Sequence, residues 1–267
     1  MIKFFRKIRL DLMKKNKTSQ YIKYAIGEII LVMIGILLAL QVNNWNNVRL
    51  KKQVENNILK QAVIDIQSML NDMKGDQGVL KMGIKSHLNI TEYINQDLTY
   101  NDTMCFDFHW LIQDEYMYPI TSAYDVLKTE GLDIIKNDSI SWGLQNVFEF
   151  NLPRISKENP FYPDVEEFFS DFYQKNFTVN KDTTLTYNFK LYEVDFKYPY
   201  KNSFEGEEYD VNMGYVPNDF EGLKKSSEFQ VLLKQAFRYR MYKYNRYESA
   251  IELLEELQRM IKKELKN

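Results

Sequence analysis

Few residues in this sequence have the types and spacing that catalysis or metal binding requires. The chain has one cysteine, Cys105, and two histidines, His87 and His109. Cys105 and His109 are four residues apart and could share a helix face, a possible metal-ligand geometry that His87, Asp107 or Asp114 could complete after folding. A buried thiol and a hydrogen-bonded histidine explain the pair more simply. We therefore predict no metal site and no cofactor.

Sequence motifs of catalysis are also missing. The chain has no G-x-S-x-G turn, no H-E-x-x-H helix, no P-loop and no G-x-G-x-x-G turn. Two acidic runs, residues 164–171 and 205–210, contain carboxylates of the kind that a glycosidase positions in pairs, but neither run has EF-hand spacing. Solvated surface is the simpler interpretation. We predict that the protein is not an enzyme.

The segment RYRMYKYNRY, Arg238–Tyr247, is the densest basic and aromatic stretch. Interleaved tyrosine and arginine side chains are typical of proteins that bind single-stranded nucleic acid. On a helix, however, consecutive residues point in different directions, and the net charge of −2 gives no general attraction to phosphates. We expect ion pairs with the glutamates that follow, along one face of a bundle, and no nucleic-acid partner.

A membrane span is the strongest feature of the sequence. Ile29–Leu40 contains no polar side chain, and extension to residues 24–44 gives about 20 residues, enough to cross a hydrocarbon core. No small-x-small cleavage site follows Leu40, which favours an uncleaved signal-anchor over a signal peptide. A buried helix of a soluble protein is the other alternative, but it does not explain the flanking aromatic residues, which are Tyr21, Tyr24 and Trp45. We predict a transmembrane helix over residues 24–45.

Cations are concentrated before this span, in a leader that covers residues 1–23. The leader contains eight of them against one acid, Asp11, whereas only Arg49, Lys51 and Lys52 follow the span closely. The positive-inside rule then places the N-terminus in the cytoplasm. We expect the leader to be an amphipathic helix on an anionic membrane surface, with cations that include Lys3, Arg6, Lys7 and Arg9.

The run YAIGEIILVMIGILLALQVNNWNN, residues 24–47, and the leader segment FFRKIR together resemble a family of uncharacterised single-span membrane proteins from Bacteroidota. The resemblance covers about the first fifty residues. It implies a bacterial inner-membrane protein whose C-terminal part is periplasmic. It supplies no activity, cofactor or catalytic residue.

Three residues of the span are candidates for an interface. Glu28, Gly35 and Ala39 are seven and four residues apart, so they share one face of a helix. Small residues allow two helices to approach closely, and an ionisable group inside a span usually faces protein. These residues could contact a second copy or the span of a partner. Alternatively, Glu28 reaches the interfacial region and the small residues have no role.

Residues 46–267 are expected to form a mainly all-α, irregular extracytoplasmic bundle with long first and last helices. Apolar residues spaced alternately four and three apart form a heptad seam, which predicts a first helix that ends near Gly75 and Gly78. The seam residues are Leu59, Val63, Ile66, Leu70 and Met73. A second helix is expected over 79–96, with Leu80, Ile84 and Leu88 facing inward. Further helices are expected over 106–115, 122–129, 139–150, 165–176 and 220–265.

One region departs from the helical pattern. The β-branched and aromatic residues of 183–200 predict a small hairpin, and 205–218 is expected to be an exposed acidic loop. The sequence as a whole favours a membrane-anchored, non-enzymatic accessory or scaffold protein whose partners are the bilayer and another span. A periplasmic ligand-sensing module is the second hypothesis, and an unrecognised carboxylate-dependent hydrolase is the third.

Overall fold

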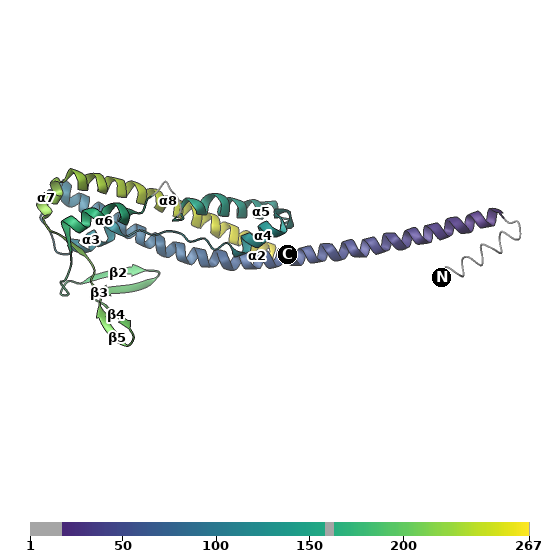
Figure 1. Ribbon diagram of the computed structural model, residues 1–267, viewed down its shortest axis with the longest axis horizontal. Helices are drawn as coiled ribbons and strands as arrows, with labels where there is room; N and C mark the ends of the chain where they lie inside the picture. The colour runs from purple at the N-terminus through teal and green to yellow at the C-terminus, as the bar shows by residue number, and fades with distance from the viewer. Residues whose placement is uncertain (1–17, 158–162, 267) are drawn as a thin grey trace. The chain divides into compact units, whose positions relative to one another are not determined.

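The computed structural model describes residues 18–157 and 163–266, so the leader cations Lys3, Arg6, Lys7 and Arg9 lie outside the described residues. Within these ranges the protein is mainly α-helical, as predicted, with seven α-helices and three small two-stranded sheets (Figure 1). The chain divides into two compact units, Met1–Asn56 and Asn57–Asn267, which we describe separately.

The first unit contains the beginning of helix α2 (Thr18–Asn95). In the described part of the chain, α2 is the one helix that is long and apolar enough to cross a membrane. None of the residues in its most apolar 18-residue window is buried. This helix fits a membrane anchor, as the sequence predicts. The limits of the span at residues 24 and 45 stay a prediction, because the backbone does not change there.

In the second unit, the rest of α2 packs antiparallel to helix α8 (Ser227–Glu264). Gln258 Nε2 donates to the Val63 carbonyl oxygen at 3.2 Å, and further along α2 the Tyr247 hydroxyl donates to Asp76 at 3.0 Å. Four residues of the predicted seam are each no more than 3% exposed, namely Leu59, Ile66, Leu70 and Met73. The fifth, Val63, is half-buried. Leu88, which we predicted to face inward, is exposed.

The predicted helix end near Gly75 and Gly78 is wrong, because α2 continues through both residues. A helix interior tolerates glycine at a cost of about 1 kcal/mol relative to alanine. At Gly75 the missing side chain has a structural role. A Cβ placed there would overlap the Tyr192 ring, so only glycine lets this ring lie on the helix backbone.

Shorter helices cover the α2–α8 pair. They are α3 (Met104–Ile112), α4 (Ser122–Glu130), α5 (Asp138–Gln145), α6 (Val165–Asn176) and α7 (Phe220–Lys225), with the 3-10 turns η1 (Leu132–Ile134) and η3 (Leu152–Arg154). The π-helical segment η2 (Asn146–Asn151) extends α5, so the helix predicted over 139–150 has two parts. The cap of α5 is Asn137, whose side chain accepts hydrogen bonds from two backbone amides.

The single helix predicted over 220–265 is interrupted. The extended backbone of Ser226 separates α7 from α8, and the Ser226 hydroxyl accepts a hydrogen bond from the Phe229 amide at 3.2 Å. This is N-cap geometry, in which a serine oxygen satisfies an amide that has no partner within its own helix. The break therefore follows from local chemistry at a serine.

The hairpin predicted over 183–200 is confirmed. Strands β2 (Tyr187–Leu191) and β3 (Val194–Tyr198) are antiparallel, and Tyr192 and Glu193 form the turn with positive φ values. The acidic loop predicted over 205–218 is exposed over most of its length but is not irregular throughout. It contributes to a second hairpin of β4 (Lys201–Phe204) and β5 (Glu207–Asp210), and β6 (Tyr215–Pro217) pairs with β1 (Phe177–Val179).

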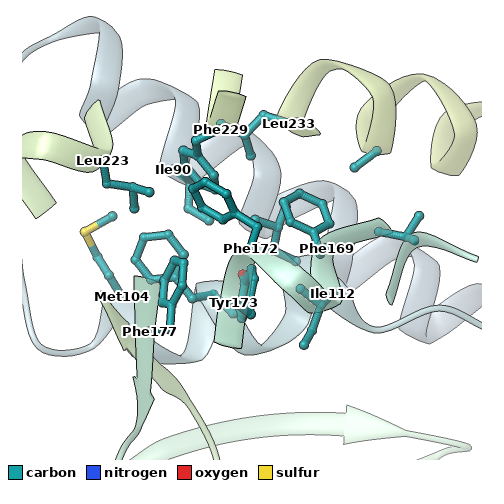
Figure 2. Packing of buried hydrophobic residues seen from close by; sticks show 14 of the residues in the cluster. Ile90, Met104, Ile112, Phe169, Phe172, Tyr173, Phe177, Leu223, Phe229 and Leu233 are labelled. Carbon is teal, nitrogen blue, oxygen red and sulfur yellow. The ribbon is translucent and has the colours of Figure 1, made fainter. Parts of the chain in front are cut away.

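An aromatic core joins α2, α3, α6, α7, α8 and β1 at one end of the second unit (Figure 2). Phe172 stacks on Phe229 with ring centroids 5.4 Å apart, and Tyr173 stacks on Phe177 at 4.1 Å. The Tyr173 hydroxyl donates to the Phe108 carbonyl oxygen at 2.8 Å, which satisfies a buried polar group. The high aromatic content of the sequence is therefore used largely for packing.

Candidate functional site

The predicted interface of the span lies on an open helix surface. Within the first unit, Gly35 and Ala39 are exposed and Glu28 is half-buried. A Cβ built on Gly35 would meet no atom within 4 Å, so the backbone there is accessible to another helix. The assignment of Glu28, Gly35 and Ala39 to an interface stays a prediction.

In the second unit, a buried carboxylate connects α2 to α8 and to the β2–β3 hairpin. Asp76 is 2% exposed, and it accepts hydrogen bonds from the hydroxyls of Tyr247 (3.0 Å) and Tyr192 (3.2 Å). Burial raises the pKa of Asp76 to about 7, against the two hydroxyls, which lower it. The Asp76 carboxyl can therefore gain or lose a proton near neutral pH.

A groove of about 760 Å³ lies beside this carboxylate, between α2 and the tip of the β2–β3 hairpin. Its walls carry exposed tyrosines, Tyr118 and Tyr192, and polar side chains of α2. We call it the α2–hairpin groove, and its other lining residues are Ser68, Met69, Asn71, Asp72, Lys74, Gly75, Gly78, Ile120, Lys190 and Glu193. Ion pairs join Lys190 to Glu193 and Lys74 to Glu255, so these charges are already paired.

A buried ion pair lies on α8 about one turn before Tyr247. Lys243 Nζ is 2.7 Å from Asp114 Oδ1, and both side chains are less than 5% exposed. Lys243 also donates to the Glu115 carbonyl oxygen at 3.2 Å and lies 3.6 Å above the Tyr116 ring. Burial lowers the pKa of Lys243, whereas Asp114 opposes that change by stabilising the ammonium form. The pair ties α8 to the segment that follows α3.

Arg240 is fully buried one turn before Lys243. Its Nη2 donates to the carbonyl oxygens of Leu111 (2.8 Å) and Gln113 (3.0 Å), where α3 ends. A cation at a helix C-terminus satisfies carbonyl groups that lack partners within the helix and complements the helix dipole. On the opposite side the guanidinium lies against Gly83 of α2, where a Cβ would approach Nε to 2.7 Å. Arg240 therefore has a packing role.

Sequence reasoning missed these buried cations, although the sequence contains a signal for them. The buried residues of α8 repeat every four and three positions, and Arg240 and Lys243 occupy two positions of that repeat. The repeat consists of Phe229, Leu233, Ala236, Arg240, Lys243, Tyr247, Ala250, Leu254, Leu257 and Ile261. A continuous heptad register predicts burial even at positions that carry a charge.

The same arrangement divides the basic and aromatic segment Arg238–Tyr247 among several faces. Arg240, Lys243 and Tyr247 point inward, whereas Arg238 is exposed. The segment therefore presents no single basic surface. One of the following glutamates, Glu255, pairs with Lys74 of α2 and not with this segment.

The structure does not bring Cys105 and the two histidines together as a metal site. Among the described residues, no group of three histidine, cysteine or acidic side chains could hold a metal ion. Cys105 is fully buried, and burial raises the pKa of its thiol to about 12. His109 packs against Tyr215 and His87 stacks on Phe237; burial lowers the pKa of each imidazole to about 4.

The two acidic runs are separate structures. Asp164 caps α6 by accepting a hydrogen bond from the Glu166 amide at 2.9 Å, and the carboxylates of 205–210 belong to the exposed β4–β5 hairpin.

Comparisons of the chain with protein-family models, with curated proteins and with solved structures find no match.

Proposed function

We propose that this protein is a membrane-anchored, non-enzymatic accessory or scaffold protein that acts through contacts of its span and of its helical domain. The main support is the exposed apolar surface of α2 in the first unit. None of the residues in its most apolar window is buried, and isoleucine, leucine and valine side chains from Ile22 to Leu50 are about half exposed or more. Such a surface is stable in lipid and unfavourable in water.

The topology is part of this proposal. The eight leader cations favour a cytoplasmic N-terminus and a periplasmic second unit, in the inner membrane of a bacterium. The resemblance of residues 24–47 to single-span proteins of Bacteroidota supports the same location. In the proposed arrangement, Lys3, Arg6, Lys7 and Arg9 bind the anionic surface of the cytoplasmic leaflet.

The span recognises its partner through Glu28, Gly35 and Ala39. The open backbone at Gly35 allows close approach, and Glu28 supplies a polar contact that lipid cannot. The partner is a second copy of the chain or another membrane protein.

Co-purification in a mild non-ionic detergent tests this interface. We expect wild-type protein to be recovered with a second, differently tagged copy or with a defined membrane partner, and Gly35→Leu to reduce that recovery at least fivefold. Leu37→Phe is the control, because it enlarges an apolar side chain two residues further on, about 160° around the helix. A strictly monomeric wild type without a partner, in detergent and after crosslinking in cells, would contradict the proposal.

The α2–hairpin groove supports a second candidate, a module that senses a ligand and signals through a partner. Its volume of about 760 Å³ is within the range of small-molecule sites, and two exposed tyrosines line it. A ligand bound there would raise the thermal unfolding midpoint of the full chain, and Tyr118→Ala would abolish that shift. A broad screen without any stabilising compound would count against this candidate.

A further inference from the structure

A second groove lies between α5 and α8, and we call it the α5–α8 groove. Figure 1 shows α5 beside the C-terminal half of α8. The groove has a volume of about 460 Å³, and its lining residues follow the helical repeat on both walls. They are Asp138, Ser139, Trp142, Gly143, Asn146 and Val147 on one wall and Leu253, Glu256, Leu257 and Met260 on the other. Each wall therefore extends for about two helical turns.

The shape of this groove depends on a close contact of the two helices. At Gly143, a Cβ would approach Leu257 Cδ1 to 2.9 Å, so glycine lets the helices meet at the floor. Val147 and Leu257 are buried there, while Leu253 and Met260 are half-buried along the wall. The result is an apolar channel between two helices, which is the geometry that receives the apolar face of a third helix.

Trp142 stands at the edge of the groove and is 67% exposed. Tryptophan is highly buried on average, and its exposure next to an apolar groove is typical of interaction surfaces. Trp110 of the same unit is 3% exposed, so exposure is a property of this position and not of tryptophan in this fold.

The charges at the groove have one sign. Asp138 and Glu256 are its charged lining residues, and no lysine or arginine is among the described residues that line it. On α8, Glu252, Glu255 and Glu256 precede Arg259, and Glu255 is paired with Lys74 of α2. A second copy of the chain would place carboxylates against carboxylates at this surface, which disfavours self-association through it. A partner with cations beside its apolar face would be complementary.

We infer that the α5–α8 groove is the docking site for a basic amphipathic helix of a partner protein, whose apolar side chains enter between Trp142, Leu253 and Met260 and whose lysines or arginines pair with Asp138 and Glu256. This inference rests on the proposed scaffold function and names the chemistry of one partner. The volume of about 460 Å³ has room for about two large apolar side chains, which a helix presents about one turn apart at i and i+4.

Binding of model peptides to the full chain in a non-ionic detergent tests this inference. The probe is a fluorescently labelled helical peptide of about 14 leucine and lysine residues, four turns long. The matched control peptide carries glutamate at every lysine position. We expect saturable binding of the leucine–lysine peptide, at least tenfold weaker binding to Glu256→Lys and to Trp142→Ala, and no measurable binding of the control peptide.

Two variants control for general effects of charge and exposure. Glu228→Lys reverses an exposed charge on the same helix 28 residues away, and Tyr118→Ala removes an aromatic side chain of similar exposure outside the groove. Both should bind the peptide as the wild type does. Equal affinity of all variants, or equal binding of both peptides, would overturn the inference. A change of oligomeric state in Trp142→Ala would also overturn it, in favour of a second copy in the groove.

The same variants separate this inference from the proposed function. If Gly35→Leu abolishes partner recovery while Glu256→Lys and Trp142→Ala bind the peptide normally, the scaffold function stands and the groove assignment fails. If the groove variants lose peptide binding but wild-type protein never recovers a partner from membranes, the groove stands as a peptide site and the scaffold function fails.

Discussion

The two parts of α2 share one helical backbone, but their apolar side chains are exposed in the first unit and buried in the second. In the first unit, Ile29, Leu31 and Leu38 are about 60% exposed or more, and none of the residues in the most apolar 18-residue window is buried. In the second unit, Leu59, Ile66 and Met69 of the same helix are fully buried. Helical geometry is thus independent of how the side chains are solvated. The apolar surface of the first part fits a membrane anchor, whereas other segments of the same chain bury the apolar side chains of the second part.

The polar residues show the inverse contrast. The second unit buries Asp76, Asp114, Arg240 and Lys243, and each of them holds two segments together through hydrogen bonds. A buried charge is costly unless it is paired, so these contacts should dominate the response of the second unit to mutation. The predictions below test this contrast, beginning with the largest expected effect.

Asp114→Ala should have the largest effect. It leaves Lys243 buried without its carboxylate and removes the acceptor of the Val165 amide. Loss of one partner of a buried ion pair costs about 3–5 kcal/mol, and we expect the free energy of unfolding to fall by about that amount. Urea unfolding of the full chain in detergent, followed by circular dichroism, measures the change.

The control is an ion pair of the same type at the surface. Lys128 Nζ lies 2.9 Å from Asp125 Oδ1, but both side chains are about half exposed. Asp125→Ala should cost less than about 1 kcal/mol, because solvent screens the pair. Similar costs for Asp114→Ala and Asp125→Ala would contradict the role assigned to burial.

Asp76→Asn should change how stability depends on pH. The pKa of Asp76 is about 7 in the folded chain and near 3.8 when unfolded, so the folded state holds its proton more tightly. The stabilising contribution of this group is complete below about pH 4 and is lost as the pH rises to about 7. Its loss amounts to at most about 4 kcal/mol, at about 1.4 kcal/mol per pKa unit.

We therefore expect the stability of Asp76→Asn relative to the wild type to increase between pH 4 and pH 7 and to stay level above about pH 8. Asp125→Asn is the control, because hydrogen bonds donated by Lys128 and Thr121 lower the pKa of Asp125, so that its contribution changes only in acid. A constant difference between Asp76→Asn and the wild type across this range would show that Asp76 is ionised throughout.

Glycine substitutions along α2 should have smaller effects of opposite sign. Gly83→Ala places a Cβ 2.7 Å from Arg240 Nε, and Arg240 is held by two carbonyl groups, so we expect a loss of about 1–3 kcal/mol. Gly78→Ala meets no atom within 4 Å and should stabilise the helix by up to about 1 kcal/mol. Chemical denaturation of both variants measures the change in the free energy of unfolding. A stabilising Gly83→Ala would show that the Arg240 side chain can move away from position 83.

The sequence predicts most helices of this fold because their apolar residues repeat at helical spacing. The predictions failed where distant contacts decide the outcome. Gly75 looked like a helix end, but Tyr192, which is 117 residues later in the chain, packs on it. The cations of 238–247 were expected to pair with the glutamates that follow, whereas Arg240 is fully buried, because it occupies a core position of the α8 repeat.

The candidate sites were predictable to different degrees. Glu28, Gly35 and Ala39 are found from spacing in one helix, and the structure adds that the backbone at Gly35 is open. The α5–α8 groove could not be found in this way. Its two walls come from segments about 110 residues apart, and their contact depends on tertiary packing. The exposed Trp142 is its one local signal, and exposure is not visible in a sequence.

The central claim is that the apolar part of α2 holds the protein in a membrane. Fractionation of cells that produce the full chain, with an alkaline carbonate wash of the membranes, tests it most directly. The account predicts that the full chain stays in the washed membrane pellet and that deletion of residues 22–45 releases it. Recovery of the full chain in the soluble fraction, with the second unit folded, would contradict the account.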